Sequence, residues 1–152
     1  MAMSANPPDG GPAKLSLVVF SASYDRVHYA LATAAAALSI NTPVTLLFTM
    51  GAVRALLAAD GGGRPGWQNL PVETGGGDGA ARDAALEAKG IGAFEELLAA
   101  CAALGATIMV CEMGLRAGGI LPADLRDDLE IAEGGLVTFL RDAAPDGAML
   151  FI

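Results

Sequence analysis

The sequence has few cysteines, few histidines and few positive charges. Its 152 residues include two Cys and one His, and nine Lys and Arg stand against 17 Asp and Glu, for a net charge of −8. Two thiols and one imidazole do not make up the ligand set of a structural zinc site, and CxxC and HxxxH spacings are missing, so we expect no metal. The acidic excess argues against nucleic acid and anionic membranes as partners, because both carry negative charge.

Long apolar runs are also missing. Hydrophobic residues make up 53% of the chain and the mean hydropathy is +0.48, yet the richest stretch, Tyr29 to Ile40, is dominated by Ala and interrupted by Thr33 and Ser39. It is shorter than the ~18–20 apolar residues that cross a bilayer, so no membrane span is predicted. The surplus of apolar surface predicts a homo-oligomer.

The N-terminal segment lacks the features of a secretion signal. Residues 1–12 contain no Lys or Arg and hold Pro7, Pro8 and Pro12, whereas a signal peptide needs a basic start and an apolar segment. We interpret residues 1–13 as a disordered tail and residues 14–152 as a single domain. Two cysteines in a chain without such a signal predict free thiols in a reducing compartment, and therefore a cytoplasmic protein.

Short apolar runs alternate with segments of helical periodicity. Each apolar run predicts a buried strand, at residues 15–20, 44–48, 107–110, 129–132 and 148–152. Apolar residues at helical spacing predict helices at residues 27–40, 53–57, 91–104 and 136–143. Strands that alternate with one-faced helices predict an α/β fold, in which a mostly parallel sheet lies between layers of helices.

Residues 61–79 form a long segment without clear periodicity. It carries Gly75-Gly76-Gly77 and the single tryptophan, Trp67. Loops of this length inside a compact domain are usually lids, interface arms or disordered segments. We expect Trp67 either to cover a pocket or to pack in a subunit interface.

The two cysteines lie in different sequence contexts. Cys101 falls on the apolar face of a predicted helix, where a free Cys packs as a small hydrophobic residue. Cys111 follows a predicted strand and precedes a Gly-rich turn, so we expect an accessible thiol held by the rigid end of a sheet. A short helix at residues 112–117 would lower the pKa of the thiol, Glu112 would oppose this effect and Arg116 would support it. Position alone leaves open whether Cys111 is functional or structural.

Other candidate pocket residues follow the predicted strands at the same edge of the sheet. They are Ser21, Ser23, Tyr24, His28, Met50, Gly51, Glu112 and Met113. His28 opens the first helix, and it either forms a dyad with Cys111 or is an ordinary surface or capping residue. The turn after the first strand either holds a small anion or simply caps the helix.

Signatures of nucleotide binding are weak. The G-x-x-x-x-G-K-[ST] pattern is missing, and residues 75–80 match G-x-G-x-x-A only formally, because no apolar strand precedes them. We therefore expect no organic cofactor.

Several of these segments together resemble one known family. They are Ser21–Asp25 before an Ala-rich helix, Val44–Gly51, Phe94–Leu98, Val110–Met113 with Gly118-Gly119-Ile120, and Ile131–Gly134. In these segments the chain, from about Lys14 to Ile152, resembles the DsrE/DsrF/TusD-like sulfur-relay (DsrE-like) family.

The resemblance implies a flavodoxin-like three-layer sandwich with a five-stranded sheet, assembled into homo- or hetero-oligomers. It also implies that Cys111 accepts sulfane sulfur as a persulfide and passes it to an acceptor thiol, with sulfur donor and acceptor proteins as partners and no cofactor. The alternative hypothesis is a small-ligand-binding or oligomeric assembly module of the same fold, without enzyme activity.

Overall fold

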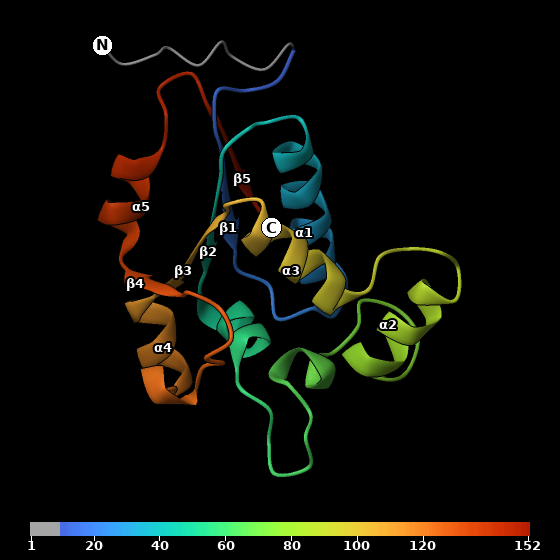
Figure 1. Cartoon of the computed structure of the whole chain (residues 1–152). Helices are drawn as coiled ribbons and strands as arrows, with labels where there is room; N and C mark the ends of the chain where they lie inside the picture. Colours follow the sequence, from blue (N-terminus) through green and yellow to red (C-terminus); the bar gives the residue numbers. More distant parts are fainter. Residues whose placement is uncertain (1–9) are drawn as a thin grey trace.

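A computed structural model describes residues 10–152 and contains one five-stranded sheet (Figure 1). Its strands are β1 (Leu15–Val19), β2 (Val44–Phe48), β3 (Thr107–Cys111), β4 (Ala132–Gly134) and β5 (Ala148–Phe151). They lie in the order β4-β3-β2-β1-β5, and every neighbouring pair is parallel. The predicted α/β fold with a parallel five-stranded sheet is confirmed.

Helices cover both faces of this sheet, which gives the predicted three layers. In Figure 1, α1 (Tyr24–Ser39) and α3 (Phe94–Ala103) lie on one side of the strands, and α5 (Leu136–Asp142) lies on the other. The short helix α4 (Glu112–Gly118) follows β3 directly and packs against a 3₁₀ helix at Met50–Leu56. Among the described residues, no helix is long and apolar enough to cross a membrane.

The central strands are buried on both faces because both faces are covered. Alternate residues of each strand enter different clusters: Leu17, Leu46 and Ile108 pack beneath α1 and α3, whereas Leu47 and Met109 pack beneath α5. This alternation follows from the strand period of two. The same alternation determines which layer of helices the last residue of each strand faces.

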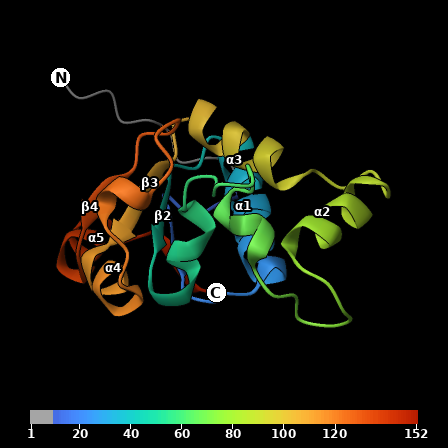
Figure 2. The same ribbon diagram turned by 90° about the horizontal axis from the view of Figure 1, so that it is seen from below.

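The predicted irregular segment is partly ordered and leads into a helix that periodicity did not reveal. It contains a 3₁₀ turn at Gly66–Asn69 and ends at α2 (Gly79–Glu87), which Figure 2 shows at the periphery beside α1 and α3. Asp78 caps α2 by accepting a hydrogen bond from the Ala81 amide. The helix escaped prediction because only Gly79 and Asp83 are buried on it, so it has no apolar stripe.

Two polar links attach α2 to the start of α1. The Tyr24 hydroxyl donates a hydrogen bond to the Asp83 carboxylate, which also accepts from the backbone N–H of Phe94 at 2.7 Å. The Arg82 guanidinium lies 2.8 Å from the Asp25 carboxylate. Burial, followed by the neighbouring Asp83 carboxylate, raises the pKa of Tyr24 well above its ordinary value, so its hydroxyl stays protonated.

Three smaller expectations differ from the structure. The fourth strand begins at Ala132 rather than at 129. Its pairing with β3 starts at Ala132, which lies opposite Met109, whereas the preceding Ile131 packs against the cluster around Val110. Leu136 and Leu140 of α5 are exposed, although they share its apolar side with Phe139. Of the predicted tail, positions 1–9 lie outside the described residues, and Ala13 donates a backbone hydrogen bond to Asp146 at 3.4 Å.

Candidate functional site

Cys111 is the last residue of β3 and the residue that precedes α4. Its backbone is extended (φ −79°, ψ 127°), and it lies opposite Gly134 of β4 in the parallel register. The strand period turns its side chain toward α5, where it joins the buried cluster with Met109 and Phe139. The residue is only 2% exposed, so the expectation of an openly accessible thiol is wrong.

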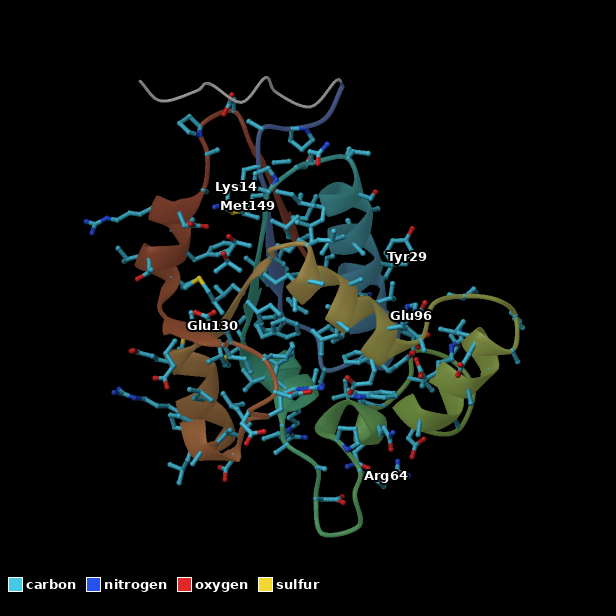
Figure 3. The ribbon with its side chains drawn as sticks, in the orientation of Figure 1. Lys14, Tyr29, Arg64, Glu96, Glu130 and Met149 are labelled. Carbon is cyan, nitrogen blue, oxygen red and sulfur yellow. The ribbon has the colours of Figure 1, made fainter. Side chains whose placement is uncertain are left out.

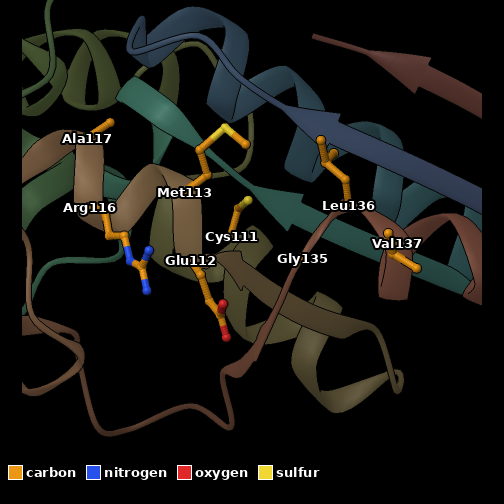
Figure 4. A pocket seen from close by; sticks show the side chains of 8 residues that line it. All are labelled: Cys111, Glu112, Met113, Arg116, Ala117, Gly135, Leu136 and Val137. Carbon is orange, nitrogen blue, oxygen red and sulfur yellow. The ribbon is translucent and has the colours of Figure 1, made fainter.

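A cavity of about 670 Å³ nevertheless reaches Cys111 from the surface (Figure 4). Its walls come from α4 and from the first residues of α5. The lining residues are Cys111, Glu112, Met113, Arg116, Ala117, Gly135, Leu136 and Val137. Met113, Leu136 and Val137 are exposed apolar residues, so the wall of the approach to the sulfur is mainly hydrophobic.

The two charged lining residues do not face the sulfur. In Figure 4, the Cys111 side chain points toward the side of the cavity that holds Met113 and Leu136, whereas the Glu112 and Arg116 side chains extend the opposite way. The immediate surroundings of the sulfur are apolar.

Cys101 provides the contrasting case. It is fully buried on α3, as its helical spacing predicted, and its Sγ donates a weak hydrogen bond to the Leu31 carbonyl at 3.5 Å. Burial raises the pKa of Cys101 to about 11. A thiol with this pKa remains almost entirely protonated at neutral pH, so Cys101 is suited to packing rather than to chemistry.

Close backbone packing holds α4 in place beside the cavity. A side chain at Gly114 would begin 2.5 Å from the backbone nitrogen of Met50, and one at Gly134 would begin 2.4 Å from the end of the Met109 side chain. At Gly114 the neighbour is backbone, so only glycine allows this approach, whereas the end of the flexible Met109 side chain can move away from position 134. Gly114 therefore sets the distance between α4 and the turn after β2.

The structure brings only some of the predicted pocket residues together. Glu112 and Met113 line the Cys111 cavity. Ser21, Met50 and Gly51 line a different cavity of about 440 Å³, at the carboxyl ends of β1 and β2.

The remaining predicted residues lie in the layer of α1 and α3. His28 lines a groove of about 770 Å³ beside α1, and its Nε2 lies 2.8 Å from the Gly92 carbonyl oxygen. Tyr24 is completely buried and is hydrogen-bonded to Asp83. Ser23 precedes α1, but its side chain forms no capping hydrogen bond. Because Cys111 faces the other side of the sheet, the structure does not form a His28–Cys111 dyad.

The expectation that Trp67 covers a pocket or packs in a subunit interface is also wrong. The residue is 4% exposed, its ring stacks on Phe94 with centroids 4.7 Å apart, and its indole N–H donates to Glu95 at 2.7 Å. Glu95 in turn pairs with Arg126. Trp67 is therefore a core residue that anchors the long segment to α3.

Sequence reasoning missed Gly135, Leu136 and Val137 as neighbours of Cys111. They follow β4, and only the pairing of β4 with β3 brings them beside the thiol. The pair Gly134-Gly135 before an amphipathic helix was the one available signal. Among the described residues, no group of three or more potential metal-binding side chains comes together.

Comparison with known proteins adds information about the fold. The chain is similar to a solved structure of a protein of unknown function, MTH1491, from Methanobacterium thermoautotrophicum. The TM-score is 0.58 at 12% sequence identity, over 91% of this chain and 98% of that one. At this identity the similarity shows a shared fold, and function has to be argued from the site. No protein-family model and no curated protein sequence matches the chain.

Proposed function

We propose that this protein carries sulfane sulfur as a persulfide on Cys111. The observation that carries the proposal is the position of this thiol in the lining of a mainly apolar cavity, at the carboxyl end of the interior parallel strand β3. In open α/β sheets, functional sites lie at this edge. The family resemblance of the sequence points to the same residue and chemistry.

The transfer consists of two exchange steps. The Cys111 thiolate attacks the terminal sulfur of a donor persulfide, R–S–S⁻; the donor S–S bond breaks, R–S⁻ leaves, and Cys111 becomes Cys–S–S⁻. An acceptor thiolate then attacks the terminal sulfur, takes it as a new persulfide and releases the Cys111 thiolate. Each step moves one sulfur atom between thiolates, so no external oxidant or reductant is needed.

The surroundings of Cys111 suit the storage of a reactive sulfur. The Phe139 ring and the rest of its cluster bury one side of the thiol, and the cavity leaves one approach for a donor or acceptor. An environment with little water protects a reactive intermediate from side reactions. The exposed apolar rim formed by Met113, Leu136 and Val137 suits contact with donor and acceptor proteins.

The setting of this function is part of the same proposal. Both cysteines are free, which fits a reducing compartment such as the cytoplasm. From the sequence resemblance we propose that the protein belongs to the DsrE-like group of sulfur-relay proteins and that it acts as an oligomer.

Mass spectrometry of the intact protein tests the proposal. After incubation with a low-molecular-weight persulfide and removal of excess donor, wild type and Cys101→Ser should gain one sulfur atom (~32 Da), and Cys111→Ser should gain none. Absence of the adduct from wild type, or its persistence in Cys111→Ser, would refute the assignment. The first result would favour a small-ligand-binding or assembly module instead.

A second pair of variants tests the route to the thiol. Leu136→Trp places a larger side chain in the wall of the cavity and should slow sulfur uptake. Leu140→Trp adds the same bulk to an exposed position of α5 outside the cavity and should leave the rate unchanged. Equal rates in the two variants would show that sulfur does not enter through this cavity.

A further inference from the structure

The two edges of the sheet differ in a way that the sulfur-carrier proposal does not explain. β4 forms one edge, is three residues long and carries Glu133. β5 forms the other edge, and its sequence Ala-Met-Leu-Phe contains no charged residue and no proline. Exposed edges are normally protected by charge, proline or shortness, because their unpaired backbone groups attract further strands. The β5 edge has four residues, one more than β4, and carries neither charge nor proline.

The backbone of β5 is free to pair on its outer side. The amides of Ala148 and Ile152 donate to the carbonyls of Lys14 and Val18, both at 2.8 Å. Successive residues of a strand direct their N–H and C=O groups to opposite sides, so those of Met149 and Phe151 point away from β1. Within residues 10–152, no strand pairs with this side of β5.

Apolar side chains border this edge on both faces of the sheet. On the α5 face, Met149 and Phe151 are exposed, and the Phe151 ring packs against that of Phe20 with centroids 5.3 Å apart. On the α1 face, Leu150 lines the groove of about 770 Å³ together with Tyr29, which projects outward from α1 in Figure 3. A strand added beside β5 would therefore need apolar side chains on both of its faces.

We propose that this edge pairs with the β5 edge of a second copy of the chain, antiparallel and around a two-fold axis. β5 itself meets the requirement, because it is apolar on both faces and its outer backbone groups are unpaired. Two chains of net charge −8 repel each other over most of their surface, so an uncharged strip is the favoured place for contact. A two-fold axis brings the same patch of both copies together and closes the assembly.

Two substitutions test the pairing by different means. Met149→Pro removes an outward N–H, a change that an edge strand tolerates while it keeps its inner hydrogen bonds. Phe151→Lys places two like charges close together across the axis. Leu121→Lys is the matched control, because Leu121 is 65% exposed, compared with 70% for Phe151, and lies far from β5 in the sequence and outside the groove.

Light scattering coupled to size-exclusion chromatography measures the result on the full chain. Wild type and Leu121→Lys should contain an even number of 15.3 kDa chains. If wild type is a dimer, both β5 variants should have half of its mass. Thermal melting confirms that each variant is folded, and Phe151→Lys remains decisive if Met149→Pro does not fold. A monomeric or trimeric wild type, or a folded Phe151→Lys variant with the wild-type mass, would overturn the proposal.

Hydrogen exchange gives a direct view of the backbone. The amides of Met149 and Phe151 should be protected in wild type and should lose that protection in a monomeric Phe151→Lys variant. Rapid exchange at both amides in a wild-type oligomer would show that the copies associate elsewhere. None of these residues lines the Cys111 cavity, so the pairing and the sulfur chemistry succeed or fail separately.

Discussion

Replacing Phe139 with Ala tests whether α5 closes the sheet over Cys111. The ring is 1% exposed and belongs to one cluster with Val18, Leu47, Met109 and Cys111. Truncation of a buried Phe to Ala costs about 3–5 kcal/mol, because transfer free energy is lost and a cavity remains. In a domain of this length, each kcal/mol lowers the melting temperature by about 2–4 °C, so we expect a decrease of about 6–20 °C.

Two measurements on this variant separate local from global effects. Circular dichroism during heating gives the melting temperature, and labelling with a disulfide reagent under native conditions gives the reactivity of each thiol. Removal of the ring should open a path to Cys111 and increase its labelling rate. Cys101 lies under α1 on the other face of the sheet and should remain slow.

Leu140→Ala is the control for this experiment, because it shortens a residue of the same helix that is 57% exposed. Its effect on stability should stay within about 0.5 kcal/mol, as for most surface changes. The reasoning would be refuted if Phe139→Ala melted at the same temperature as Leu140→Ala. Equal labelling rates for both cysteines of Phe139→Ala would show that the whole domain opens, and not only the region around Cys111.

Three further predictions concern stability. Tyr24→Phe removes a buried hydrogen bond to the Asp83 carboxylate and should destabilise the protein by about 1.5–3 kcal/mol in urea denaturation. The hydrogen bond from Lys14 holds the pKa of Asp142 below its ordinary value, so this carboxylate stabilises the fold above its unfolded-state pKa and loses that effect as pH falls through the folded-state value. In Asp142→Asn the free energy of unfolding should therefore decrease less steeply with pH below about pH 5. The same slope as in wild type over this pH range would contradict the assignment. Gly114→Ala inserts a methyl group against the backbone and should cost at least the ~1–3 kcal/mol of ordinary overpacking, measured by thermal melting.

The parts of the fold with strong local signals were predictable. β1, β2 and β5 are short apolar runs next to turn residues, and α1 carries a regular apolar stripe, so each was found within a few residues of its observed bounds. The helix α2 has no such stripe. Ionic and hydrogen-bond contacts with residues distant in the sequence hold it in place instead. Its Asp83 is buried only because Tyr24 lies opposite, and no local pattern contains that information.

The candidate site was predictable only in its centre. Cys111 was singled out by its place after a strand, and Glu112 and Met113 followed from adjacency. The other predicted pocket residues share the carboxyl edge of the sheet with Cys111, but they line other cavities or lie at the start of α1, on the opposite face of the sheet. A common sheet edge does not by itself bring side chains into contact.

The sequence by itself determined the alternation of strands and helices, the parallel character of the sheet and the different positions of the two cysteines, one on a helix and one at the end of a strand. These properties depend on contacts between residues near in the chain and on periodicities that a sequence displays directly. Only the tertiary structure decided that the Cys111 thiol is buried under Phe139, that residues 135–137 enclose its approach, and that β5 is an open edge. Strand order sets all three, and strand order results from packing between segments that lie far apart in the sequence.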